Sequence, residues 1–227
     1  SGQFRNWRYH GQGRLDRADG SFYTGGFRHG HFDGEGVLTQ ADGTELRGSW
    51  RNDRRVRDEQ ADALSDPLEL ALLGQGSLLE RAISALPPSS PAQDLYTLTV
   101  AGDGRQSVFM RETDYVQKLL AERFAAHGQL SLVNHRDHLV DRPLATRENL
   151  TRAIRALAER SGEEDLIFLY FTSHGSADHE LVLNQPRLSL DDLPAADLAQ
   201  LLAPLAKRKV ILVISACYSG GFIKPLK

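Results

Sequence analysis

The sequence predicts an α/β protein with a doubly wound, mostly parallel sheet, preceded by a segment of β-hairpin repeats. Three observations lead to this fold class. Residues 166–172 and 210–214 are continuous apolar runs rich in β-branched or aromatic side chains, which is typical of buried parallel strands. Helical patterns alternate with such runs from residue 94 onward. The first fifty residues repeat with an offset of 32 − 9 = 23, which indicates stacked units.

The repeats come first along the chain. An aromatic residue followed by glycines spaced two apart occurs at Tyr9 and again at Phe32, and the pair Asp19-Gly20 returns as Asp42-Gly43. An aspartate-glycine pair between short alternating runs predicts a hairpin turn. This stretch resembles MORN repeats, in about two copies over residues 1–53. The resemblance implies membrane association or dimerisation in some relatives, and a passive β-appendage is the alternative.

A linker follows the repeats. The basic run at 51–57 offers a contact for anionic lipid, although its acidic neighbours favour a solvated linker. Leucines at helical spacing over 62–86, interrupted by two glycines, predict one or two short helices. The proline-rich stretch 87–91 then marks a boundary. We therefore expect MORN-like hairpins over 1–57, a helical linker over 58–92 and the α/β domain over 93–227.

The sequence predicts alternating strands and helices throughout the α/β domain. Strands are predicted over 95–101, 130–133, 166–172 and 210–214, helices over 113–127, 146–160 and 191–206, and a small hairpin arm over 180–184. Thr146 is a plausible N-cap for the second helix. Repeated strand–helix units lead to a parallel sheet with right-handed crossovers.

Composition excludes several classes of function. The chain has 227 residues, 41% of them hydrophobic, which allows one sizeable core and an appendage, or two small domains. The formal net charge of −3 gives no global basic field, so we expect no nucleic-acid partner. The single cysteine excludes an intramolecular disulfide framework. No histidine pair has the cysteine or carboxylate neighbours typical of a zinc site, so no metal is expected.

Two reactive side chains follow the two apolar runs. His174 follows the first run and Cys217 follows the second. Sites in open α/β sheets lie beyond the carboxyl ends of the strands, so the imidazole and the thiol should share one crevice. A histidine can take the proton of a thiol and later protonate a leaving amine. The N–H groups of Gly175 and Cys217 are candidate oxyanion donors, and this chemistry requires no cofactor.

The residues around this pair resemble a known family. The segments Tyr-Phe-Thr-Ser-His-Gly at 170–175 and Ser-Ala-Cys-Tyr-Ser-Gly at 215–220 look like the two catalytic segments of the legumain family, in the same clan as caspases. The spacing of 217 − 174 = 43 residues is similar in kind to that of caspases. The resemblance covers residues 94–222. It implies a caspase-like fold, His174 as general base and Cys217 as nucleophile of a peptidase.

The resemblance also suggests the rest of the site. Asp103 would be a third, orienting member of the catalytic group, and Arg105 lies where the family often places a pocket arginine. The asparagine-specific members carry acidic residues beside the histidine and the cysteine, where this chain has Ser173 and Tyr218. Asp103 and Asp192 are then the candidate pocket acids. The substrate-binding residues expected on this basis are Arg105, Ser173, Ser215, Tyr218 and Asp192.

The C-terminal end of the chain suggests a processing event. A caspase-like sheet has further strands after the nucleophile, whereas Lys227 lies 227 − 217 = 10 residues beyond Cys217. We expect a C-terminal small-subunit fragment to complete the sheet. Lys227 would then be a processing end, and self-cleavage there would imply a preference for a basic residue. A truncation explains the same end equally well.

Three alternatives to a peptidase stay open. A transamidase of the same family would use the same residues, a non-catalytic scaffold would work through the repeats, and a lipid-binding module would be led by them. The partners expected are therefore a peptide or protein substrate and, through the repeats, membrane lipid. Bacterial proteins that pair these two segments look extracytoplasmic and lipid-anchored. This favours a periplasmic or membrane-anchored location, although the sequence itself leaves the location unknown.

Overall fold

The structure is a computed structural model that describes residues 1–226, so the expected processing end at Lys227 lies outside the described residues. The chain forms two compact units, which meet in sequence between Glu69 and Leu70. Each unit has its own hydrophobic cluster. None of the helices in the described part is long and apolar enough to cross a membrane.

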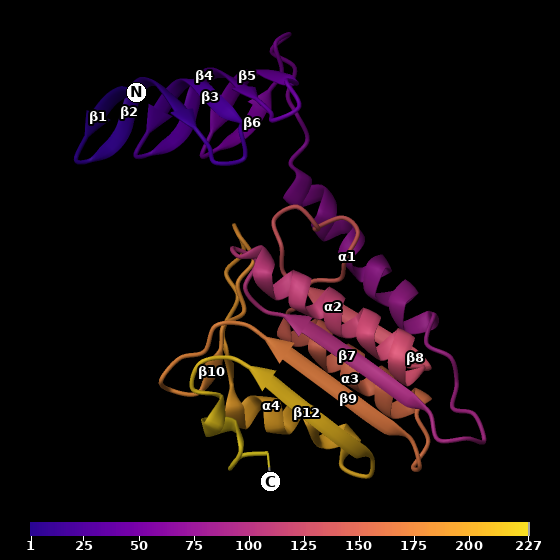
Figure 1. Cartoon of the computed structure of the whole chain (residues 1–227). Coiled ribbons are helices and arrows are strands. Elements are labelled where there is room, and N and C mark those ends of the chain that lie inside the picture. Colours follow the sequence, from indigo (N-terminus) through magenta and orange to yellow (C-terminus); the bar gives the residue numbers. More distant parts are fainter. Residues whose placement is uncertain (227) are drawn as a thin grey trace. The chain divides into compact units, whose positions relative to one another are not determined.

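The first unit is a six-stranded antiparallel sheet in which each strand pairs with the next one along the chain. Its strands are β1 (Gly2–Arg5), β2 (Arg8–Asp16), β3 (Phe22–Arg28), β4 (His31–Thr39), β5 (Glu45–Arg51) and β6 (Arg54–Arg57). Figure 1 shows them as a row of successive hairpins. The predicted hairpin repeats are therefore confirmed. Turns at Asp19-Gly20 and Asp42-Gly43 connect β2 to β3 and β4 to β5.

Aromatic side chains hold these hairpins together. The buried cluster consists of Tyr23, Phe27, Phe32 and Trp50. The rings of Tyr23 and Phe32 are stacked with centroids 3.7 Å apart, while Trp50 meets Tyr23 edge-on at 5.3 Å. Aromatic pairs in these geometries stabilise a fold beyond the area that they bury. Because one hairpin cannot bury such rings alone, the repeats stabilise one another.

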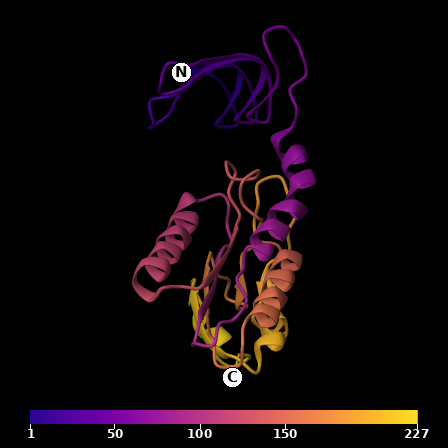
Figure 2. The same cartoon turned by 90° about the vertical axis from the view of Figure 1, so that its right-hand side faces the viewer.

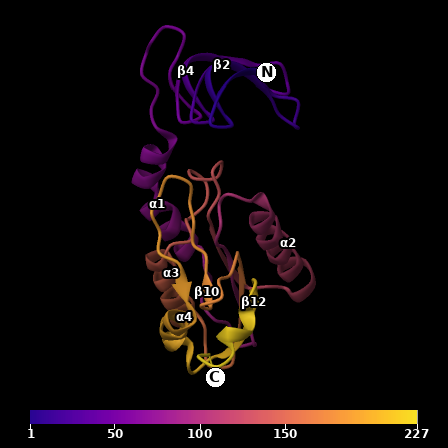
Figure 3. The same ribbon diagram turned by 90° about the vertical axis from the view of Figure 1, so that its left-hand side faces the viewer.

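The second unit contains a four-stranded parallel sheet in the order β12-β9-β7-β8. Its strands are β7 (Leu95–Ala101), β8 (Gly128–Val133), β9 (Leu166–Thr172) and β12 (Lys209–Ser215), and its helices are α1 (Pro67–Ser84), α2 (Ser107–Phe124), α3 (Arg147–Arg160) and α4 (Ala195–Leu202). Figures 2 and 3 show α2 on one face of the sheet and α1, α3 and α4 on the other. The parallel α/β sheet is as predicted and is compatible with a caspase-like fold.

Most element boundaries agree with the sequence-based expectations. Thr146 is the N-cap of α3, because its hydroxyl oxygen accepts a hydrogen bond of 3.2 Å from the Asn149 N–H. The strands at 95–101 and 166–172 have the expected bounds. The linker forms one helix, α1, which runs through both of its glycines. The hairpin arm expected over 180–184 is shorter: only β10 (Glu180–Leu181) is a strand there, and its partner residues are Leu193 and Pro194.

Two helix predictions were wrong at their starts. α2 begins at Ser107 rather than at residue 113, because Phe109 in its first turn is buried against Ala101 and Val133. The predicted helix over 191–206 is shorter, since β11 (Leu193–Pro194) pairs with β10 before α4 begins. A 3-10 helix, η1 (Ala203–Leu205), follows α4.

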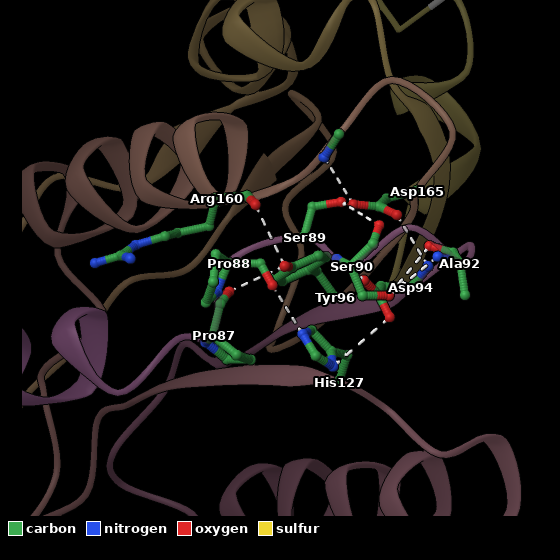
Figure 4. Close-up of polar contacts among 11 residues, drawn as sticks. Pro87, Pro88, Ser89, Ser90, Ala92, Asp94, Tyr96, His127, Arg160 and Asp165 are labelled. Atoms are coloured by element: carbon green, nitrogen blue, oxygen red, sulfur yellow. Dashed lines mark hydrogen bonds and ion pairs between the residues drawn. The ribbon is translucent and has the colours of Figure 1, made fainter.

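A network of hydrogen bonds fixes the proline-rich linker at the amino ends of the strands (Figure 4). The buried carboxylate of Asp165 accepts bonds from the N–H groups of Asp94, at 2.9 Å, and Gly162, at 2.7 Å. The hydroxyl of Tyr96 donates to the carbonyl of Pro87 at 3.0 Å. Burial opposes ionisation of Asp165, but the N–H donors outweigh it and hold its pKa below the usual value. This network anchors β7 at the end of the sheet opposite to the catalytic candidates.

Candidate active site

The two catalytic candidates lie at the carboxyl ends of adjacent strands. Strands β9 and β12 pair in parallel, and the last pair in register is Thr172 with Ser215. His174 and Cys217 each follow two residues beyond that pair, since 174 − 172 = 2 and 217 − 215 = 2. Figure 1 shows the ends of β9 and β12 side by side. Both side chains are exposed, so the described structure leaves both accessible to a substrate.

The backbone after His174 lies directly against the backbone of Cys217. A Cβ atom on Gly175 would lie 2.0 Å from the carbonyl oxygen of Cys217 and 3.3 Å from the Cβ atom of Ala216. Real Cβ atoms do not approach so closely, and therefore only glycine fits here without moving the Cys217 loop. The residue that follows the histidine thus sets the separation between the two strand ends.

Two backbone N–H groups at this point are free to bind an oxyanion. The backbone hydrogen bonds on either side of Gly175 do not involve its N–H group. The His174 carbonyl accepts from Val182 N at 3.0 Å, and Ser176 N donates to the Glu180 carbonyl at 3.0 Å. Within residues 1–226, the N–H groups of Gly175 and Cys217 have no protein acceptor. These are the two oxyanion donors expected from the sequence, and their role stays a prediction.

Cys217 lies at a sharp turn between β12 and the 3-10 helix η2 (Ser219–Phe222). The next residue, Tyr218, has the left-handed conformation with φ 57° and ψ 18°, which is uncommon for a residue with a bulky side chain. Such conformations concentrate at functional sites. Gly221 is required farther along, because the ring of His179 occupies the space that a Cβ atom would fill, 2.1 Å away.

The first turn of α2 supplies the neighbours of the His174 ring. The side-chain nitrogen of Gln106 lies 2.9 Å from His174 Nε2. Phe109 meets the same ring edge-on, with centroids 5.0 Å apart and planes at 84°. Neither residue was expected from the sequence, because the helix was predicted to begin at residue 113. Gln106 is the extended N-cap residue of α2 rather than part of the helix, so no helix-face spacing in the sequence indicated this pair.

Asp103, the expected orienting residue, has other partners. Its carboxylate is buried and accepts hydrogen bonds from Arg105 N at 2.9 Å, Arg105 Nε at 3.3 Å and Asn184 Nδ2 at 2.9 Å. Burial raises its pKa, but these donors outweigh that effect and lower it overall. Its described contacts do not include His174. The orienting role of Asp103 therefore stays a prediction, while its contacts tie residues 180–184 to the end of β7.

The other expected substrate-binding residues fall into two groups. Arg105, Ser215 and Tyr218 are exposed, with 60% of Tyr218 accessible beside Cys217, although Arg105 Nε also donates to Asp103. Ser173 and Asp192 are bound within the protein instead. The hydroxyl of Ser173 donates to a backbone carbonyl at 2.6 Å, and the carboxylate of Asp192 accepts from a backbone N–H at 3.1 Å. The first group is open to a ligand, and the second holds the loop over 180–184.

The fold and this site define a class of protein: an α/β domain with an exposed thiol, a neighbouring imidazole and two free N–H groups at the carboxyl edge of its sheet. Residues 147–227 match the Peptidase C13 family, and residues 1–22 and 23–45 each match the MORN repeat. The first match spans 227 − 147 + 1 = 81 residues and contains His174 and Cys217. These matches confirm the expected resemblance and support a legumain-like cysteine peptidase. No curated protein matches the chain.

Proposed function

We propose that the protein is a cysteine endopeptidase in which Cys217 forms a thioester with the substrate. The thiol sulfur attacks the scissile carbonyl while His174 takes the thiol proton. His174 then gives this proton to the leaving amine, and water hydrolyses the thioester with His174 again acting as base. The free N–H groups of Gly175 and Cys217 stabilise the oxyanion. The observation that carries this proposal is the equivalent placement of His174 and Cys217 on paired strands.

The contact with Gln106 determines which nitrogen of His174 accepts the thiol proton. Because Gln106 contacts Nε2, the nitrogen left for the thiol proton is Nδ1. With its nitrogen toward the ring, the amide of Gln106 donates to an unprotonated Nε2. Turning the amide by 180° presents its oxygen, which accepts the Nε2–H and leaves Nδ1 free as a base. We expect this second orientation in the reactive enzyme.

The test is cleavage of a positional peptide library by the natural full-length protein and by its Cys217→Ala variant. Cleavage by the wild type that is lost in the variant supports the proposal. Equal cleavage by both forms refutes it, because the activity would not depend on the thiol. A wild type that neither cleaves peptides nor reacts at Cys217 with thiol-directed acyloxymethyl ketones would favour a scaffold. Added amine nucleophiles identify a transamidase, whose product carries the amine instead of a free carboxylate.

Preference for a basic residue and self-processing at Lys227 are the finer parts of the proposal. A lysine or arginine side chain in the substrate requires an acidic partner. Since Asp103 and Asp192 both have their carboxylates engaged by donors within the protein, another acid or a movement of one of these is needed. The intact mass of the precursor with Cys217→Ala tests self-processing: a variant that is still cut after Lys227 excludes it.

The open edge of β12 supports a partner that completes the sheet. β12 pairs only with β9 in the described structure, and Val210, Ile211 and Val213 remain 37–44% exposed. Hollows of about 480 and 420 Å³ lie beside it, and both are lined by Leu212 and Leu226. An unpaired apolar strand edge favours pairing with another strand. We propose that a C-terminal small-subunit fragment occupies this edge.

The repeat unit offers a second candidate function, binding to anionic membrane lipid. The turns between β1 and β2 and between β3 and β4 place cationic side chains at the same end of the hairpins. There Arg5, Asn6, Arg8, His10 and His29 line a hollow of about 400 Å³. Neither arginine has an acidic partner within residues 1–226. Sedimentation of the full chain with vesicles tests this idea. Binding to phosphatidylserine vesicles that is lost in an Arg5→Glu/Arg8→Glu variant supports it, whereas unchanged binding excludes this hollow as the site.

A further inference from the structure

His135 lies at the carboxyl end of β8, outside the set of catalytic candidates, and it is almost fully buried. Only 5% of its surface is exposed. Its Nδ1 accepts a hydrogen bond of 3.2 Å from the Asp137 N–H, and its Nε2 lies 2.8 Å from the hydroxyl oxygen of Ser107. A nitrogen that accepts from a backbone N–H carries no proton of its own. The proton of the neutral ring is therefore on Nε2, which donates to Ser107.

Burial keeps this ring neutral. Loss of solvent is the largest effect on His135, and together with the positive charges of Arg136 and Arg142 it lowers the pKa of the ring despite the opposing charge of Asp137. A neutral ring with a fixed tautomer is a fixed donor at Nε2. His135 therefore acts on Ser107 in one defined way through the neutral pH range.

Ser107 is the first residue of α2, and this helix lacks an ordinary N-terminal cap. Gln106 occupies the N-cap position with extended backbone angles, φ −127° and ψ 117°, but its side chain makes no capping hydrogen bond. That side chain contacts His174 Nε2 instead. The start of α2 is thus held by a donor from the loop that follows β8, which leaves the Gln106 amide available for the catalytic candidate.

The position of this turn determines two contacts on the His174 ring. Gln106 precedes Ser107 directly, and Phe109 follows it by two residues. Both touch the ring, one at Nε2 and the other edge-on. A shift of the turn therefore changes both contacts together, and displacements of about 1 Å at a catalytic group cost up to about a hundredfold in rate.

We infer that His135 is a positioning residue for His174, acting through Ser107 and the first turn of α2. This inference rests on the proposed role of His174 as base, and it names a regulator of the same site. The relay has three steps: His135 Nε2–H holds Ser107, Ser107 fixes the turn, and the turn presents Gln106 and Phe109 to the ring. It predicts an effect on catalysis from a residue that touches neither substrate nor nucleophile.

The experiment compares imidazole NMR spectra, peptide turnover and melting temperature in the natural full-length protein. The variants are His135→Leu, Ser107→Ala and His135→Gln, whose amide nitrogen can replace Nε2 as donor. His127→Gln is the matched control, because His127 contacts the Pro88 carbonyl at the opposite end of the sheet. We expect the first two variants to move the His174 signals and lower kcat on the order of tenfold, with KM little changed. His135→Gln should restore both readouts, and the control should match the wild type.

Two outcomes would overturn the inference. One is unchanged His174 signals and kcat in His135→Leu, with only the melting temperature lowered, since this describes a structural residue. The other is a His135→Gln variant as impaired as His135→Leu, since packing rather than the donated hydrogen bond would then be responsible. If the wild type cleaves no peptide, the proposed function fails, but the NMR comparison still decides whether His135 controls the His174 ring.

Discussion

His174 and Cys217 occupy equivalent positions on paired strands, each two residues beyond the register pair of Thr172 and Ser215. Parallel pairing keeps this equivalence, because neither β9 nor β12 contains a bulge that would shift one end against the other. The geometry of the site is therefore a consequence of sheet register. A change that moves one strand end should affect activity before it affects stability of the fold.

Gly175 is the position where this can be tested most directly. We expect Gly175→Ala to lower kcat/KM by at least about a hundredfold, because the new Cβ would lie 2.0 Å from the Cys217 carbonyl oxygen and displace the proposed nucleophile. Gly220→Ala is the matched control, since a Cβ there meets nothing within 4 Å. Peptide turnover and thermal melting of both variants are the measurements. Wild-type activity in Gly175→Ala would show that the close approach does not exist in the working enzyme.

Gln106 should matter through its polar group rather than its size. We expect Gln106→Met, which keeps a similar length but cannot hydrogen-bond, to lower kcat roughly tenfold while leaving the melting temperature nearly unchanged. The amide is exposed and caps no helix, so its loss leaves no buried group without a partner. Steady-state kinetics on a peptide found in the library screen measure the effect. A tenfold loss of kcat in Asp103→Asn together with unchanged kcat in Gln106→Met would contradict this prediction and would indicate that Asp103 orients His174.

The strands that carry the site were predictable from sequence because their apolar runs are continuous and end at small residues. The bounds of β9 and the N-cap at Thr146 followed from such local signals. The contact of Gln106 with His174 was not predictable. It spans 68 residues, and it depends on a helix start fixed by Phe109 packing and by His135 rather than by a capping side chain. Likewise, only the fold shows that the Asp103 carboxylate accepts hydrogen bonds from Arg105 and Asn184.

The open edge of β12 makes a prediction about assembly. We expect Val213→Lys to weaken binding of the proposed C-terminal small-subunit fragment by about tenfold or more, because lysine on an edge strand opposes pairing. Tyr115→Lys is the control, since Tyr115 is 67% exposed on α2, whereas Val213 is 37% exposed on β12. Copurification of the two fragments and their dissociation constant measure the effect. Equal binding by the variant and the control would mean that the fragment binds elsewhere.

Asp165 makes a prediction about stability and pH. Asp165→Asn replaces an acceptor oxygen by a donor that faces an N–H of Asp94 or Gly162, so we expect a loss of about 1–3 kcal/mol in unfolding free energy at pH 7. The pKa of Asp165 is lower in the folded state than in the unfolded chain, where it is about 3.9. The ionised carboxylate therefore stabilises the fold fully above the pKa of the unfolded chain, and this contribution is lost as the pH falls through the pKa of the folded state.

The difference in unfolding free energy between the wild type and Asp165→Asn should therefore stay constant from about pH 5 to 8 and shrink below about pH 4. Urea unfolding across this range measures it, with Asp178→Asn as control, since Asp178 is exposed and has no partner within residues 1–226. A difference that persists undiminished at pH 2.5 would contradict the charge-based account. It would show that shape and packing around residue 165, rather than the ionised carboxylate, hold the linker to the amino edge of the sheet.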